Sequence, residues 1–117
     1  MPIRVLIVDD DAAFREEIAR ELTARGYEIA GFAATLAGAR AGLGTLDPDA
    51  VLLDINLPDG NGIVFAGEVR SRARILLTST DAGAAPARLV ERSGAAGFVA
   101  KTDLLDADLG RYLGPAG

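Results

Sequence analysis

Short apolar runs alternate with amphipathic segments along the whole sequence. The first run, Ile3–Val8, shows no regular polar–apolar alternation, which is typical of a strand covered on both faces. Similar runs lie at residues 27–32, 50–53, 74–77 and 97–100. The segments between them carry apolar residues at helical spacing. This repetition predicts an α/β fold in which a doubly wound, five-stranded parallel sheet has helices on both faces.

Local signals mark where the helices begin and end. Asp11 is placed to cap the first helix, and Gly26 stands where a helix usually ends. Asp103 is expected to cap a last helix, whose apolar stripe comprises Leu105, Leu109, Tyr112 and Leu113. Further helices are predicted at residues 35–46, 63–72 and 84–92, and turn residues predict a loop at 57–62.

The length of 117 residues fits a single domain. We expect residues 3–113 to be ordered and residues 114–117 to form a tail or the start of a linker. No apolar run approaches the roughly 20 residues needed to cross a membrane, and the first residues lack the features of a signal peptide. A cytoplasmic protein that does not associate with membranes is therefore expected.

The residue types that are missing exclude several kinds of chemistry. The chain has no cysteine and no histidine, so disulfides, thiolate metal sites and Ser–His–Asp triads are excluded. The formal net charge of −5 and the scarcity of aromatic residues argue against direct nucleic-acid binding. The single lysine, Lys101, occurs among many arginines, which hints at a role that requires a compact ammonium group.

Polar side chains follow four of the five predicted strands. Asp9 and Asp10 come after the first strand, Asp54 after the third, Thr78 after the fourth and Lys101 after the fifth. In open parallel sheets, ligands bind beyond the carboxyl ends of the strands. If these four strands lie side by side, one small crevice holds carboxylates, a hydroxyl and an ammonium group.

The contents of this crevice favour a phosphoryl group bound with a metal ion. Clustered carboxylates repel one another unless a cation joins them, and oxygen ligands without histidine or cysteine suit Mg²⁺. A Mg²⁺ ion with free positions accepts phosphate oxygens, while Thr78 and Lys101 are suited to hold the remaining ones. Asp54 is the candidate nucleophile, because carboxylates form acyl phosphates.

Four short motifs, in this order and at the strand ends, carry a resemblance to a known family. They are Val-Asp-Asp at 8–10, Leu-Asp-Ile-Asn-Leu-Pro-Asp-Gly-Asn-Gly at 53–62, Leu-Thr-Ser at 77–79 and Gly-Phe-Val-Ala-Lys at 97–101. The chain resembles the receiver domain of two-component response regulators across about residues 3–113. The resemblance implies one receiver domain over residues 1–117, with the flavodoxin-like strand order 2-1-3-4-5.

The resemblance also implies roles for individual residues. Asp54 would be the phosphoacceptor, with Thr78 donating its hydroxyl to the phosphoryl group and Lys101 pairing with Asp54 and then with the phosphate. Phe98 would be an aromatic switch that turns inward when Thr78 moves. The implied ligands of the Mg²⁺ cofactor are Asp10 directly, Asp9 through a water molecule, Asp54, and the backbone carbonyl of Asn56.

Two positions depart from the family pattern. Thr102 follows Lys101 where the family often has proline. The sequence therefore does not decide whether the peptide bond after Lys101 has the cis form that is usual in the family. The subgroup with a helix-turn-helix output domain often lacks that proline, so the change leans toward that subgroup. Ser79 stands where a small alanine or glycine is usual, and its hydroxymethyl group could narrow access to Asp54.

Each candidate residue also has a plainer interpretation. Asp9 and Asp10 suit a helix N-terminus, where acidic residues are favourable, and Asp54 suits a loop cap. The hydroxyl of Thr78 could be satisfied by the backbone, and Lys101 could be a surface charge. Phe98 could simply belong to the core, as aromatic residues in strands usually do.

The function predicted from these observations is a signalling switch that catalyses only its own phosphorylation and dephosphorylation. A sensor histidine kinase or a phosphotransfer protein would donate the phosphoryl group, and the change would alter a partner-binding or dimerisation surface. One alternative is a receiver-like binding module that is never phosphorylated. Another is an aspartyl-phosphate phosphohydrolase, which requires an acid–base aspartate at the position of Asn56. The surface expected to change carries Arg88, Glu91, Arg92, Asp106, Asp108 and Arg111.

Overall fold

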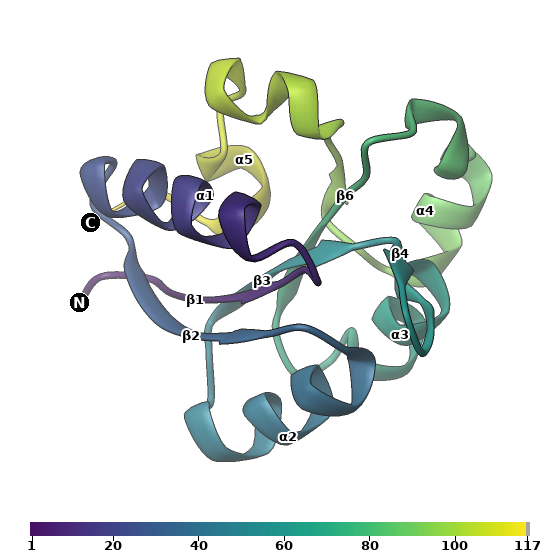
Figure 1. The fold of residues 1–117 in the computed structure, drawn as a ribbon, viewed down its shortest axis with the longest axis horizontal. Helices are drawn as coiled ribbons and strands as arrows, with labels where there is room; N and C mark the ends of the chain where they lie inside the picture. Colours follow the sequence, from purple (N-terminus) through teal and green to yellow (C-terminus); the bar gives the residue numbers. More distant parts are fainter. Residues whose placement is uncertain (117) are drawn as a thin grey trace.

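The computed structural model describes residues 1–116 and contains one main parallel sheet (Figure 1). Its five strands are β2 (Glu28–Ala33), β1 (Arg4–Val8), β3 (Ala50–Asp54), β6 (Arg74–Thr78) and β7 (Gly97–Phe98), in that spatial order. Two further short strands, β4 (Asn56–Leu57) and β5 (Gly60–Asn61), pair only with each other as an antiparallel hairpin. The main sheet therefore has the predicted order 2-1-3-4-5, and its central strand is β3.

Helices cover both faces of the sheet, as the sequence pattern predicts. The α-helices are α1 (Ala12–Ala24), α2 (Leu36–Leu46), α3 (Gly62–Val69), α4 (Ala87–Ser93) and α5 (Gly110–Leu113), and the 3-10 helices are η1 (Ala82–Ala84) and η2 (Lys101–Asp106). Figure 1 shows α1 and α5 on one side of the sheet and α2 on the other. None of the helices in the described part of the chain has the length and hydrophobicity that crossing a bilayer requires.

Two apolar layers enclose the sheet. Val5 and Ile7 of β1 pack in the layer beneath α1 and α5, whereas Leu6 and Val8 pack in the layer beneath α2, α3 and α4. Successive side chains of a strand point to opposite faces, so a strand buried between two layers must be apolar at every position. This double coverage explains why the first run lacks polar–apolar alternation.

The predicted ends of α1 are confirmed. The Asp11 side chain accepts hydrogen bonds from the backbone N–H groups of Ala13 and Phe14, at 3.0 and 3.2 Å. Gly26, with φ of 100°, supplies the left-handed conformation that follows the helix. The cap begins α1 directly after Asp9 and Asp10, so it fixes the chain where β1 ends.

The C-terminal helix differs from the prediction. Instead of one helix capped by Asp103, the chain forms η2, then an extended Ala107 (φ −81°, ψ 152°), then the single turn α5. Asp103 lies inside the first turn of η2 and does not cap it. Aspartates and a glycine, which are weak helix formers, lie around the break, and the Arg25 guanidinium donates to the carbonyls of Leu105 and Ala107. These hydrogen bonds satisfy carbonyl groups that the interrupted helix leaves free.

Three other elements are shorter than predicted. The helix predicted at 84–92 begins only at Ala87, because Pro86 occupies the N-cap position after η1. The helix predicted at 63–72 ends at Val69, and the strand predicted at 97–100 ends at Phe98. Part of the predicted loop at 57–62 forms the β4–β5 hairpin.

The turn of this hairpin is tied to the start of α2. The carboxylate oxygens of Asp59 accept hydrogen bonds from the N–H groups of Leu36 and Ala37, at 2.8 and 3.0 Å. Thr35, the N-cap, accepts one from Gly38 at 3.0 Å. These acceptors satisfy N–H groups that an isolated helix leaves unpaired, and a negative charge there is favourable. Asp59 thus holds the segment that follows Asp54 against α2.

Replacing Asp59 with asparagine is expected to lower the melting temperature at neutral pH by an amount that disappears in acid. The hydrogen bonds from Leu36 and then Ala37 lower the pKa of Asp59, so its stabilising effect is present above the unfolded carboxyl pKa of about 4 and is lost as the pH falls through the folded value. Thermal unfolding of the wild type and Asp59→Asn across the acid range measures this. The control is Asp106→Asn, an exposed position, and a deficit that does not change with pH would contradict the prediction.

Candidate functional site

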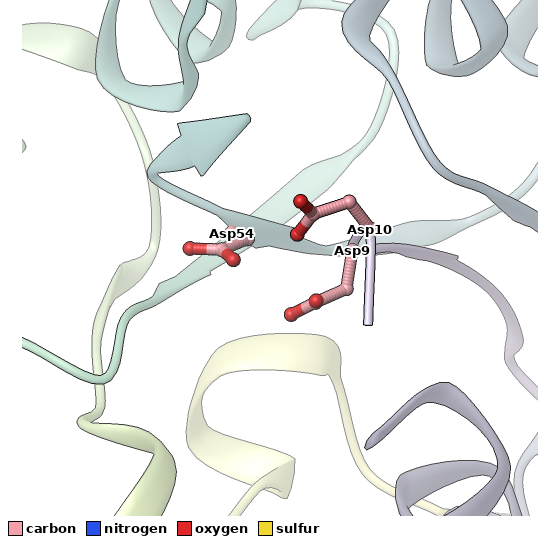
Figure 2. Close-up of side chains that lie close together, drawn as sticks. All are labelled: Asp9, Asp10 and Asp54. Atoms are coloured by element: carbon pink, nitrogen blue, oxygen red, sulfur yellow. The ribbon is translucent and has the colours of Figure 1, made fainter. Parts of the chain in front are cut away.

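Three acidic side chains meet at the carboxyl edge of the sheet (Figure 2). Asp9 and Asp10 directly follow β1, and Asp54 is the last residue of the neighbouring strand β3. One carboxylate oxygen from each residue lies within 4.8 Å of the others. Figure 2 shows the carboxylates of Asp9 and Asp10 directed toward the side on which Asp54 lies. The parallel pairing of β1 with β3 therefore brings together residues that are far apart in the sequence, as expected.

The three carboxylates differ in their exposure to solvent. Asp9 is 0% and Asp54 5% exposed, whereas Asp10 is exposed. The Asp9 carboxylate accepts a hydrogen bond from the backbone N–H of Asp11, at 2.9 Å. Two buried carboxylates side by side are unfavourable unless positive charge compensates them. The exposed carboxylate of Asp10 leaves such a cation a route from solvent.

Lys101 supplies positive charge at this cluster. Its Nζ lies 2.6 Å from Oδ2 of Asp9 and 3.5 Å from Oδ2 of Asp54, and its side chain is only 13% exposed. The backbone N–H of Lys101 donates to the carbonyl of Ser79 at 3.0 Å, which holds the end of the β7 segment beside β6. The ammonium group thus bridges both buried carboxylates, and the contact with Asp9 is the shorter one.

Burial and charge shift the ionisation of two of these groups. Burial raises the pKa of Asp54, and the nearby Asp9 charge adds to this, although the Asn56 N–H and Lys101 act in the opposite direction. Burial by itself would lower the pKa of Lys101, but the hydrogen bond and charge of Asp9, together with Asp54, outweigh it and raise that pKa. Lys101 is therefore fully charged at neutral pH.

Thr78 places a free hydroxyl group beside Asp54. The two residues are direct partners in the pairing of β3 with β6. Thr78 is fully buried, and its Oγ1 has no hydrogen-bond partner within the described residues. An unsatisfied buried hydroxyl is unfavourable, so this atom is available to a ligand oxygen. The plainer interpretation, in which the backbone satisfies this hydroxyl, does not hold in this structure.

Asn56 and Ser79 connect the loops on the two sides of Asp54. The N–H of Asn56 donates to Oδ1 of Asp54 at 3.1 Å, and its side-chain amide donates to Oγ of Ser79 at 3.3 Å. The same Ser79 oxygen accepts the N–H of Asp81 at 3.1 Å. The sequence pointed only to an effect of Ser79 on access to Asp54, whereas in the structure the Ser79 hydroxyl bridges the two loops.

The sequence left two further features undecided, which are the role of Phe98 and the cis or trans form of the peptide bond after Lys101. Phe98 is half-buried and packs against the apolar layer beneath α2, α3 and α4, and Leu77 is its pairing partner in β6. Its role as a switch stays a prediction. The Lys101–Thr102 bond is trans, since no cis peptide bond occurs within residues 1–116.

Two residues of α1 that the sequence did not single out also border the site. The ring centroid of Phe14 lies 4.3 Å from Nζ of Lys101, and Nη1 of Arg15 donates to the backbone carbonyl of Asp9 at 2.6 Å. Phe14 lies at helical spacing from Ile18 and Leu22, and this spacing by itself marks only an apolar stripe. No sequence signal shows that its ring faces an ammonium group, because the partner is distant in the sequence.

Comparison with known proteins relates the chain to response regulators. The family model for the response regulator receiver domain matches residues 5–107. A protein-glutamate methylesterase/protein-glutamine glutaminase of Anaeromyxobacter dehalogenans is 38% identical over 117 residues, which cover 95% of this chain and 33% of that protein. The chain thus spans about a third of the length of the curated relatives it matches.

Solved structures show the same fold. A two-component response regulator of the LuxR family from Aurantimonas sp. superimposes with a TM-score of 0.78 at 32% identity, covering 92% of this chain and 82% of the other. A response regulator protein from Burkholderia pseudomallei, solved with a phosphorylated aspartic acid, a calcium ion and citrate, gives a TM-score of 0.82 at 25% identity, covering 94% and 66%.

Proposed function

Because the chain belongs to the response regulator receiver domain family, we propose that it is a phosphoacceptor switch in which Asp54 accepts a phosphoryl group in the presence of Mg²⁺. The proposal is based on the charged and polar groups that surround Asp54. Its carboxylate lies beside the ammonium group of Lys101 and the carboxylates of Asp9 and Asp10. The hydroxyl of its strand partner Thr78 has no hydrogen-bond partner among residues 1–116. The relative that contains a phosphorylated aspartic acid supports the same chemistry.

The residues of the acidic cluster fit a Mg²⁺ ion. The carboxylate oxygens of Asp9, Asp10 and Asp54 lie close enough together to share one cation, and such hard oxygen donors are the ligands that Mg²⁺ prefers. The backbone carbonyl of Asn56 and a water held by Asp9 complete the proposed ligand set. When bound, the ion neutralises the negative charge that keeps a phosphoryl group away from the carboxylates.

The transfer from a histidine kinase or a phosphotransfer protein needs no reactant besides the phosphohistidine and Asp54. An oxygen of the Asp54 carboxylate bonds to phosphorus while the phosphorus–nitrogen bond of the donor phosphohistidine breaks, and the imidazole leaves with the electron pair. Lys101 and Thr78 then face the phosphoryl oxygens and stabilise their charge. The chain contributes alignment and charge compensation, and acts only on its own aspartate.

Phosphorylation would change the surface of the protein through movements of Thr78 and Phe98. The phosphoryl group carries a charge of about −1.5 to −2 in place of the single charge of the carboxylate, and it draws charged and hydroxyl partners toward it. A shift of Thr78 would then give Phe98 room to turn inward. The changed surface is proposed to bind a partner or a second copy of the chain. It carries the exposed charged residues Arg88, Glu91, Arg92, Asp106, Asp108 and Arg111.

Incubation with acetyl phosphate and Mg²⁺, followed by intact-mass measurement, tests the proposal. We expect the wild-type chain to gain the mass of one phosphoryl group, and we expect an excess of EDTA to prevent the gain because the carboxylates then repel the donor. No gain with any divalent metal would favour a receiver-like module that is never phosphorylated. Continuous turnover of small phosphate esters would favour a phosphohydrolase.

A further inference from the structure

The ring of Phe14 lies against the charged end of Lys101. The distance from Nζ to the ring centroid is 4.3 Å, within the range of cation–π attraction. Phe14 belongs to the first turn of α1, where its backbone N–H is held by the Asp11 cap at 3.2 Å. The backbone that carries the ring is thus held by the same cap that begins the helix after Asp9 and Asp10.

Partial burial strengthens the attraction between the Phe14 ring and the ammonium group of Lys101. The side chain of Lys101 is 13% exposed, and a small cavity of about 230 Å³ beside it is lined partly by Phe14, Ile18 and Leu104. Solvent screens a cation–π attraction less when the cation is partly desolvated. The ring therefore acts on an ammonium group that water reaches only in part.

The ammonium group has two competing carboxylate partners. Its Nζ is 2.6 Å from Asp9 and 3.5 Å from Asp54, so attraction to Asp9 alone would draw it away from the acceptor. An aromatic face attracts the charge without accepting its N–H groups as a carboxylate oxygen does. The ring thus restrains the ammonium group and leaves N–H donors free for oxygens at Asp54.

We propose that Phe14 is a positioning residue whose ring holds the ammonium group of Lys101 where it can pair with a phosphoryl group arriving at Asp54. The inference rests on the proposed function, because it concerns the same transfer. It adds a residue of α1 to the set that prepares the site. The attraction persists when the Asp54 carboxylate becomes an acyl phosphate, so Lys101 is kept in place through the transfer.

The kinetic test separates the charge on the ring from its volume. Phosphorylation of the wild type by acetyl phosphate with Mg²⁺ is compared with Phe14→Leu, Phe14→Tyr and a series of increasingly fluorinated phenylalanines at the same position. We expect Phe14→Leu to slow phosphorylation by about threefold to tenfold, fluorination to slow it progressively, and Phe14→Tyr to keep the wild-type rate. The control Phe32→Leu removes an aromatic ring that is 51% exposed, and its rate is expected to be unchanged.

A second measurement detects the contact without any phosphoryl transfer. Lys101 is the only lysine, so lysine labelled with ¹³C gives a single set of side-chain NMR signals. We expect the ring to shift the ε-methylene signal upfield in the wild type and Phe14→Tyr, and Phe14→Leu to remove that shift.

The outcomes separate this inference from the proposed function. A wild-type chain that takes up no phosphoryl group overturns both. Normal uptake together with an unchanged rate in Phe14→Leu overturns the positioning role of Phe14 alone. An ε-methylene signal that does not respond to Phe14→Leu likewise overturns it, whatever the kinetics show.

Discussion

Asp54→Asn should abolish phosphoryl uptake entirely. An amide of nearly the same size occupies the same space, but it lacks the anionic oxygen that bonds to phosphorus. Asp54 is 5% exposed and has Asp9 as a buried neighbour, so removing its charge also relieves repulsion and the variant should stay folded. Intact mass after incubation with acetyl phosphate and Mg²⁺ measures the loss, and circular dichroism checks the fold.

Asp47→Asn is the matched control for this variant. It makes the same chemical change at an exposed position directly after α2 and should gain one phosphoryl group as the wild type does. If Asp54→Asn still gained a phosphoryl group, another residue would be the acceptor and the proposed role of Asp54 would be wrong.

Gly62→Ala should both destabilise the protein and slow phosphorylation. A Cβ at this position would collide with the backbone carbonyl oxygen of Asp54 and lie 2.9 Å from Cα of Ile55, while the Gly62 N–H donates to the Ile55 carbonyl at 2.7 Å. Backbone atoms cannot move aside as a flexible side chain can, so we expect a loss of about 3 kcal/mol in the free energy of unfolding. A displacement of about 1 Å at the acceptor can reduce the transfer rate by about a hundredfold.

Gly44→Ala makes the same substitution as Gly62→Ala, but we expect it to stabilise the protein. A Cβ at Gly44 of α2 meets no atom of the described residues within 4 Å, and alanine is favoured over glycine inside a helix by about 0.5–1 kcal/mol. Urea unfolding should therefore show Gly44→Ala to be more stable than the wild type, with an unchanged phosphorylation rate. Equal effects at the two positions would show that close packing against Asp54 is not what requires Gly62.

The convergence of the site could be predicted because it follows from parallel pairing. Each of four residues directly follows a strand pattern in the sequence, namely Asp9, Asp54, Thr78 and Lys101, and Asp10 comes one residue later. The carboxyl ends of parallel strands meet at one edge of the sheet. A local pattern is enough to locate each strand end to within about two residues, and the parallel order of the strands then brings these ends together.

Features that depend on distant partners could not be predicted in the same way. Phe14 looks like any apolar residue of an amphipathic helix, and Asp59 looks like any turn residue, because each acquires its role from a segment far along the chain. The break between η2 and α5 is similar. The apolar stripe predicted one helix, but weak helix formers and the Arg25 hydrogen bonds to the carbonyls favour two short ones.

The role of Asp54 as phosphoacceptor can be tested by a crystal structure of the chain with Mg²⁺ and beryllium trifluoride, a tetrahedral analogue of a phosphoryl group. We expect the analogue on an oxygen of Asp54, with Lys101 and Thr78 in contact with its fluorines. We expect the Mg²⁺ ion to be held by Asp9, Asp10 and Asp54. A structure with the metal bound and the analogue absent from Asp54, or attached to another side chain, would contradict it.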